Sequence, residues 1–377
     1  MKIPAAINVR TLLCFFFLVI AETHGSGRIN DLVAGSGRPE PIEVAKDGHG
    51  FVYAQSRTPF VVWGVNYDHN ESGRLLEDYW DDAWPVVRED FREMKALGAN
   101  VVRIHLQTGS FFEDSRAISK PALQNLSRLL ELAERTGLYL NITGLGCYHK
   151  DEVPAWYDAM EESERWKIQA TFWGAVAATC AHSPAVFCYD LMNEPILPGR
   201  DKPADGWLAG EFGGKHFVQY ITRDLRGRTR RAVARAWVET LTDAIRRGDP
   251  DSMITVGVIP WAHTWPNAKP IFYSPEVRGP LDFASVHFYP RKDKVEKALR
   301  ALQVYEVGMP LVIEEMFPLR CSIEEMNAFI EGSRDIADGW ISFYWGTTAE
   351  EYRAGERDAA ALIKAAWLDY FANKKIR

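Results

Sequence analysis

The chain has 377 residues, of which 47% are hydrophobic and 25% are charged, a balance typical of soluble globular proteins. This length accommodates one large α/β barrel or two domains of average size. A formal net charge of −7 argues against nucleic acid as the main partner.

The N-terminal segment has the composition of a secretory signal peptide. Lys2 and Arg10 precede an apolar run at residues 12–21, and small residues follow it. Because this run is too short for a comfortable membrane span, we expect a signal peptide over residues 1–25 and a secreted or periplasmic protein. An uncleaved anchor is the alternative, and no membrane partner is expected once the signal is removed. The Gly-, Ser- and Pro-rich residues 26–40 are expected to form a linker.

A β-hairpin is expected at residues 42–53, where alternating apolar residues flank an Asp-Gly-His-Gly turn. Such a hairpin is suited to plugging one end of a barrel. Strands and helices then alternate. Strands are predicted at residues 60–66, 101–106, 138–143, 186–192, 253–258, 281–288, 311–313 and 340–345. Helices are predicted at residues 84–97, 121–135, 161–181, 229–246, 294–305, 322–333 and 359–373.

Strand–helix alternation of this count and length indicates an α/β fold, a (β/α)8 (TIM) barrel over residues 41–377. Most of the strands are nearly continuous apolar runs, as expected for a buried parallel sheet. Nucleotide-binding folds are disfavoured because no Gly-x-Gly-x-x-Gly or Walker motif occurs. The helical pattern is weak at residues 262–277, which we expect to be mostly loop. The insertion at residues 196–228 is long for a barrel loop, and forms either a small core of its own or a wall of the substrate cleft.

Polar and aromatic side chains gather where the predicted strands end. In a barrel these ends converge on one mouth. The residues concerned are Asn66, Arg103, His105, Cys147, Tyr148, His149, Asn193, Glu194, Trp261, His287, Tyr289, Glu314, Glu315 and Trp345. Carboxylates on the fourth and seventh strands, with His, Tyr and Trp between them, favour a catalytic site over ordinary loop polarity.

Two opposed carboxyl groups are the machinery of glycoside hydrolysis. Glu194 would be the acid/base, and Glu315 the nucleophile, kept ionised by donors such as Arg103 and Tyr289. Asn193 suits a hydrogen bond to the sugar 2-hydroxyl. Adjacent strand residues point to opposite faces, so only one glutamate of the Glu314–Glu315 pair is expected to reach the pocket. The physics of the sequence does not choose between them.

Five short motifs make a family resemblance specific, and this resemblance extends over nearly all of residues 42–377. They are Gly98-Ala-Asn-Val-Val-Arg103-Ile, Leu191-Met-Asn193-Glu194-Pro195, His287-Phe-Tyr289, Ile313-Glu-Glu315-Met and Tyr344-Trp345. The set resembles glycoside hydrolase clan A, closest to family 5, the cellulase and mannanase family. This resemblance implies that Glu194 is the acid/base and Glu315 the nucleophile.

The resemblance also implies supporting roles for Arg103, Asn193, His287, Tyr289 and Trp345, with Trp345 as a sugar platform. His149 and Trp261, which follow the third and fifth strands, are further candidates for substrate binding. The third strand ends in Gly-Leu-Gly-Cys-Tyr-His rather than in the common Asp-x-His form.

We therefore expect a monomeric, retaining β-glycoside hydrolase that cleaves a β-mannan- or β-glucan-type carbohydrate by double displacement. A transglycosylase with the same site and a non-catalytic carbohydrate-binding barrel are the alternatives. No His, Cys and Asp residues have the spacing of metal ligands, so we expect neither a catalytic metal nor a cofactor.

Overall fold

The computed structural model describes residues 39–343, 345–355 and 358–376. The expected signal peptide at residues 1–25 and nearly all of the expected linker lie outside these residues. Within the described ranges, no helix combines the length and the apolar composition needed to cross a membrane.

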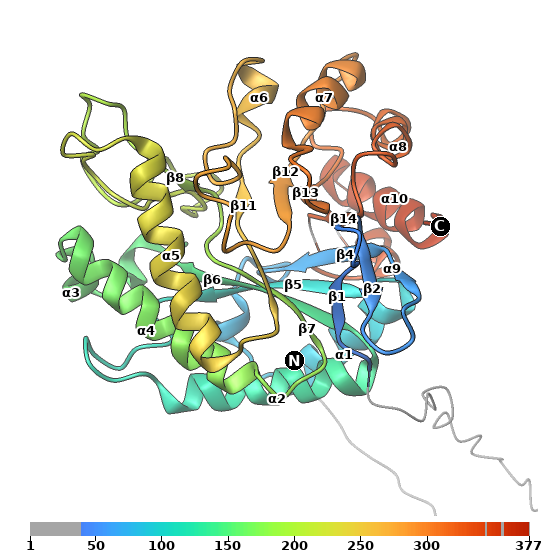
Figure 1. Ribbon diagram of the computed structural model, residues 1–377. Coiled ribbons are helices and arrows are strands. Elements are labelled where there is room, and N and C mark those ends of the chain that lie inside the picture. Colours follow the sequence, from blue (N-terminus) through green and yellow to red (C-terminus); the bar gives the residue numbers. More distant parts are fainter. Residues whose placement is uncertain (1–38, 344, 356–357, 377) are drawn as a thin grey trace, which may run out of the picture. The chain divides into compact units, whose positions relative to one another are not determined.

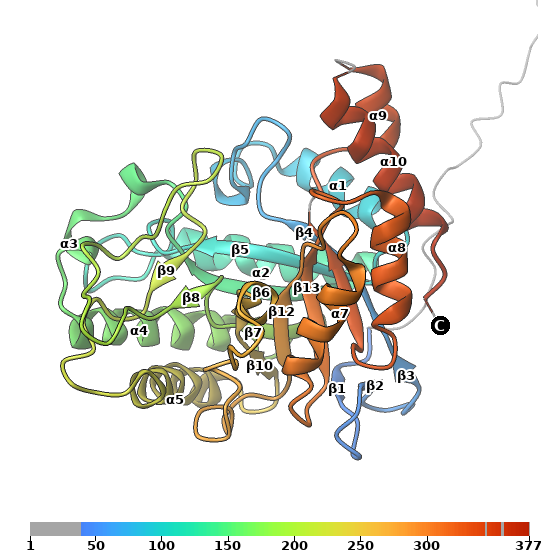
Figure 2. The same ribbon diagram turned by 90° about the horizontal axis from the view of Figure 1, so that it is seen from above.

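Parallel strands form a barrel at the centre of the described chain (Figures 1 and 2). They are β4 (Val62–Tyr67), β5 (Val101–Gln107), β6 (Tyr139–Gly146), β7 (Val186–Asp190), β10 (Met253–Thr255), β11 (Gly257–Val258), β12 (Ala284–His287), β13 (Leu311–Met316) and β14 (Gly339–Ser342). β14 pairs with β4. β10 pairs with β7 and β11 pairs with β12, so the single segment that carries both, interrupted at Val256, closes the circle. The predicted barrel is confirmed.

Helices connect the strands and cover the outside of the barrel (Figure 1). They are α1 (Trp84–Ala96), α2 (Lys120–Thr136), α4 (Glu162–Cys180), α5 (Arg230–Gly248), α7 (Val295–Leu302), α8 (Ile323–Gly332) and α10 (Ala359–Asn373), with the short α3 (Ala155–Asp158) and α9 (Ala349–Ala354). The predicted helices are present, and Thr229 caps α5 by accepting a hydrogen bond from the amide of Ala232. Between β11 and β12 the chain forms only the four-residue α6 (Trp261–Thr264), as its weak helical pattern predicts.

A small antiparallel sheet lies under the barrel at its N-terminal end. Its strands are β1 (Ile42–Val44), β2 (Phe51–Tyr53) and β3 (Pro59–Phe60). Ile42, Phe51 and Phe60 pack in one apolar cluster with barrel residues such as Phe187 and Phe283. Phe51 contacts both of those rings edge-on, with centroids 5.2 Å apart. The predicted hairpin therefore does plug one end of the barrel, which leaves the C-terminal end of the strands open.

The insertion at residues 196–228 both packs on itself and lines the open end of the barrel. Its short parallel pair, β8 (Pro195–Ile196) and β9 (Gln219–Tyr220), anchors it beside the end of β7. Trp207 is buried between the guanidinium groups of Arg165 and Arg223, at 4.5 Å and 5.1 Å from its ring. Phe212 and Phe217 instead line the cavity described below. Both alternatives considered for the insertion therefore hold in part.

Candidate active site

Glu194 turns into the barrel mouth through a left-handed backbone conformation. β7 ends at Asp190, and Glu194 has φ 46°, a value that a residue with a side chain seldom adopts. Its amide donates a hydrogen bond to the carbonyl of Gly257 at 3.0 Å, which holds the turn against the neighbouring strand segment. Backbone strain of this kind is concentrated at functional sites.

Both glutamates of β13 lie inside the barrel, because a bulge interrupts the strand. Val286 pairs with Ile313, but His287 pairs with Glu315, so Glu314 is an extra residue on β13. Only Glu315 lines the cavity at the barrel mouth. The expectation that one of the pair reaches the pocket holds, but Glu314 does not point outward. It is fully buried and accepts a hydrogen bond from the side-chain amide of Asn141.

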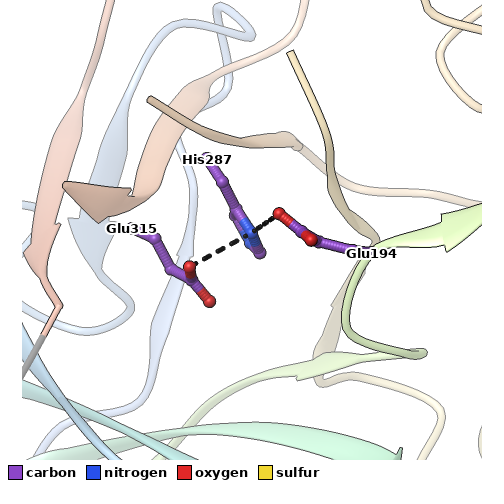
Figure 3. A group of neighbouring side chains, drawn as sticks. All are labelled: Glu194, His287 and Glu315. Carbon is purple, nitrogen blue, oxygen red and sulfur yellow. Dashed lines mark hydrogen bonds and ion pairs between the residues drawn. The ribbon is translucent and has the colours of Figure 1, made fainter. Parts of the chain in front are cut away.

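Glu194, His287 and Glu315 form the centre of the site (Figure 3). One polar atom from each lies within 4.8 Å of the others. His287 Nδ1 is 2.9 Å from Glu194 Oε1 and 3.4 Å from Glu315 Oε2. The imidazole, at the end of β12, thus stands between two carboxyl groups from opposite sides of the barrel: Glu194 on the segment after β7 and Glu315 on β13.

Arg103 on β5 donates hydrogen bonds to several polar groups around these three residues. Its Nη1 donates to Glu315 Oε1 at 2.7 Å, and its Nη2 donates to Asp190 Oδ2 at 2.8 Å and to Asn193 Oδ1 at 2.9 Å. Nη1 also donates to Asn66 Oδ1 at 3.0 Å. Arg103 is fully buried, so these bonds hold its planar guanidinium rigidly. The second oxygen of Glu315 accepts from the Tyr289 hydroxyl at 2.7 Å.

Burial and the neighbouring charges shift the pKa values of these groups in opposite directions. Burial lowers the pKa of His287, but Glu315 and Glu194 raise it more, and the result is a pKa of about 10. Burial raises the pKa of Glu315 against the opposing charges of His287 and Arg103. Burial also favours the neutral form of Glu314, yet Arg103 and His287 overcome it and lower that pKa. His287 is therefore a cation at neutral pH, surrounded by acidic groups.

A cavity of about 610 Å³ opens above these residues. Its lining includes polar and aromatic residues: Asn193, Glu194, Lys215, Phe212, Phe217, Tyr289, Glu315, Phe317 and Phe343. His69 and Glu71, from the loop after β4, line it as well. The Asn193 side chain donates one amide hydrogen to the Phe217 carbonyl at 2.9 Å, which leaves its second hydrogen for a ligand.

Three residues predicted to contact the sugar, His149, Trp261 and Trp345, do not line this cavity. His149 lines a separate, smaller pocket beside Gln107. Trp261 is 41% exposed on α6, where its ring lies against Trp265 with centroids 5.3 Å apart. Trp345 is only 1% exposed. Because a sugar platform must offer an open ring face, the structure does not present Trp345 in that role, and the cavity is lined by Phe rings instead.

A family model described as cellulase, glycosyl hydrolase family 5, matches residues 65–376. The chain belongs to glycoside hydrolase family 5. It is therefore a carbohydrate-active hydrolase, which removes the non-catalytic binding barrel from the alternatives. A comparison with curated protein sequences found no match.

Solved structures with the same fold include family members of several activities. An exo-β-1,4-mannosidase from Opitutaceae bacterium strain TAV5 aligns with TM-score 0.63 and 15% identity over 87% of this chain and 61% of the mannosidase. The endoglucanase catalytic domain from Thermobifida fusca aligns with TM-score 0.57 and 15% identity over 90% and 100% of the two chains. The endo-1,4-β-mannanase from Rhizomucor miehei aligns with TM-score 0.57 and 15% identity over 89% and 100%. At these identities the likeness establishes the fold alone.

The hydrolase also has site residues that sequence reasoning missed. Asp190 accepts hydrogen bonds from Arg103, from the Thr143 hydroxyl at 2.8 Å and from the Gly257 amide at 2.8 Å. Burial and Glu314 raise its pKa to about 6. A carboxylate within an otherwise apolar strand was the available signal for Asp190. Gly257 gave no such signal, because it contributes only backbone groups and the room left by its missing side chain.

Glu194, His287 and Glu315 also have a geometry that could hold a divalent cation. A protonated imidazole has no lone pair at Nδ1 for a metal, and the raised pKa of His287 favours that protonated form. The expectation of a metal-free reaction remains a prediction, which activity in the presence of a strong chelator would test.

Proposed function

We propose that this family 5 hydrolase is a retaining β-glycosidase that works by double displacement. The observation that carries the proposal is the close approach of Glu194 and Glu315, whose oxygens lie within 4.8 Å of each other. Retaining enzymes hold their two carboxyl groups about 5–5.5 Å apart, whereas inverting enzymes leave about 6.5–9.5 Å for a water. The separation of Glu194 and Glu315 therefore falls on the retaining side of this division.

In the first step, Glu315 attacks the anomeric carbon and Glu194 donates its proton to the leaving oxygen. A covalent glycosyl–Glu315 ester and a free alcohol result. Arg103 and Tyr289 each donate to one Glu315 oxygen, which orients the carboxylate and favours its ionised form. The second hydrogen of the Asn193 amide is available to the sugar 2-hydroxyl.

In the second step, Glu194 takes a proton from water, and the hydroxide attacks the anomeric carbon and releases Glu315. The glycosidic configuration is inverted twice and so retained. His287 donates a hydrogen bond to the Glu194 carboxylate in this step and so orients it. If an acceptor sugar replaced water, the same residues would carry out transglycosylation, which product analysis with added acceptors would reveal.

We propose a substrate made of β-1,4-linked mannose or glucose units. Phe212, Phe217, Phe317 and Phe343 line the cavity with aromatic surface, which suits the flat apolar faces of β-linked pyranoses. The similar structures named above are described as an exo-β-1,4-mannosidase, an endoglucanase and an endo-1,4-β-mannanase. We also propose export, on the strength of the N-terminal sequence, because a polymeric substrate of this kind lies outside the cell.

Two variants test the mechanism. Glu315→Gln should abolish turnover of every glycoside, because no nucleophile remains. Glu194→Gln should lower turnover of natural glycosides by about 10²–10⁴-fold, and much less where the leaving group is a good one such as a nitrophenol. The exposed Glu113→Gln is the matched control and should behave as wild type. Proton NMR of the first-formed product should show the β anomer, and an α product would exclude double displacement.

A further inference from the structure

Lys215 is a buried cation in the wall of the substrate cavity. Its side chain is among the cavity lining, and only 7% of the residue is exposed. Within the described residues, its ammonium takes part in no hydrogen bond or ion pair. The ammonium is not among the buried side-chain atoms that lack a partner, so it faces the cavity rather than a closed apolar interior. The described chain supplies no counter-charge for it, and an anionic group bound in the cavity would do so.

A tight turn holds Lys215 in place. Phe212 and Lys215 exchange backbone hydrogen bonds, at 2.9 Å from the Phe212 amide and 3.1 Å from the Lys215 amide. Gly213 and Gly214 between them have φ values of 59° and 80°, the left-handed pair of a type I′ turn. The turn places Phe212 and Lys215 side by side on the cavity wall. The lysine is thus presented by rigid backbone.

The Lys215 ammonium reaches the opposite wall of the cavity. Its Nζ lies 3.4 Å from the point where a Cβ on Gly73 would stand, and no other atom comes within 4 Å of that point. Gly73 belongs to the loop after β4 and lines the same cavity. The acidic residue of that loop, Glu71, is engaged elsewhere, with Tyr352 at 2.7 Å and Lys364 at 3.5 Å. It does not neutralise Lys215.

The catalytic carboxyl groups do not need Lys215 either. Arg103, Tyr289 and His287 supply the donors around Glu315 and Glu194. A neutral sugar hydroxyl could accept a hydrogen bond from Lys215, but it would bring no counter-charge. An anionic group on the substrate would satisfy both the hydrogen bonds and the charge.

We propose that Lys215 binds an anionic substituent of the glycan, a carboxylate or a sulfate ester, and that the preferred substrate is an acidic β-glycan. This inference rests on the proposed glycosidase function and narrows its substrate class. The sugar ring stacks near Phe212, and its charged substituent meets the ammonium between the two loops.

The test compares matched β-1,4-gluco-oligosaccharides that are neutral, oxidised to the carboxylate at C6, or sulfated at C6. For the wild type, kcat/KM should be at least about tenfold higher on one of the two acidic forms than on the neutral form, and the better form identifies the group. Lys215→Met should lower the acidic-to-neutral ratio by at least about tenfold, whereas Lys215→Arg should keep most of it. Lys202→Met, an exposed lysine of the same insertion, is the control and should leave the ratio unchanged.

Binding provides a second measurement that does not depend on turnover or on the stability of Lys215→Met. Calorimetric titration of the Glu315→Gln protein with the same oligosaccharides should give a tighter Kd for an acidic form. Equal or weaker affinity for both acidic forms would overturn the proposal. Failure of the glycosidase proposal has a different outcome, namely no hydrolysis of any oligosaccharide, while the binding comparison still decides the role of Lys215.

Discussion

Arg103 Nη1 donates a 2.7 Å hydrogen bond to Glu315 Oε1 inside the barrel. The other terminal nitrogen of the same guanidinium donates to Asp190 and Asn193 at the end of β7. One side chain on β5 therefore positions both the β13 carboxylate and the segment that carries Glu194. The planar fork of arginine makes this possible, because its five donors point in fixed directions.

Arg103→Lys should therefore impair this hydrolase although the positive charge is kept. An ammonium cannot bridge Glu315, Asp190 and Asn193 together, so we expect kcat/KM to fall by at least about 100-fold. Losing the donor to Glu315 should also raise that carboxyl pKa further, which would shift the acidic limb of the pH–rate profile to higher pH. A simple folding defect would instead lower activity equally at every pH, so the profile and a melting curve together separate the two explanations.

The raised pKa of His287 predicts that the stability of the protein depends on pH. Its pKa is raised to about 10 in the folded protein, compared with about 6.5 in the unfolded chain. A raised pKa contributes stability that is fully present below pH 6.5 and is lost as pH rises toward 10. The wild-type unfolding free energy should therefore decrease through this window, by a few kcal/mol.

The difference between wild type and His287→Asn isolates this effect from other groups that titrate at high pH. Denaturant unfolding at pH 6, 8 and 10 should show the two curves converging as pH rises. The exposed His182→Asn should run parallel to wild type. A constant gap between wild type and His287→Asn would mean that the imidazole is not protonated in the folded protein.

Much of this architecture could be predicted from the sequence. The alternation of strands and helices is a strong signal because buried parallel strands are apolar throughout, and helices such as α2, α5 and α7 have clear amphipathic periodicity. The ends of the strands located Glu194, His287, Tyr289 and Glu315. These residues share a physical signal, since each is a polar group at or just after the end of an apolar run.

The remaining features depend on tertiary geometry. The bulge at Glu314 turns two consecutive glutamates inward, against the alternation that a regular strand would follow. Trp345 follows β14, yet its side chain is buried. Lys215 lies in a loop of mixed composition, where nothing local distinguishes it from a solvated lysine.

The structure requires a residue without a side chain at position 257. A Cβ at this position would stand 2.7 Å from both Glu314 Oε2 and His287 Nε2, and 3.2 Å from Asp190 Oδ2. Gly257→Ala should therefore displace His287 and lower both activity and stability, the latter by about 1–3 kcal/mol. Gly279→Ala is the matched control, because a Cβ there meets nothing within 4 Å. Equal behaviour of the two variants in activity and thermal unfolding would show that the buried groups can move aside.

A variant at Phe212 would test whether the insertion at residues 196–228 takes part in substrate binding. Its ring lines the cavity but is 68% exposed, so truncation should have little effect on folding. We expect Phe212→Ala to raise KM for oligosaccharides by about 3- to 10-fold, through loss of one stacking surface, with kcat nearly unchanged. Trp265→Ala removes a ring that is 58% exposed outside the cavity and serves as the control. A KM increase for Trp265→Ala but not for Phe212→Ala would mean that the substrate extends along α6 rather than along the insertion.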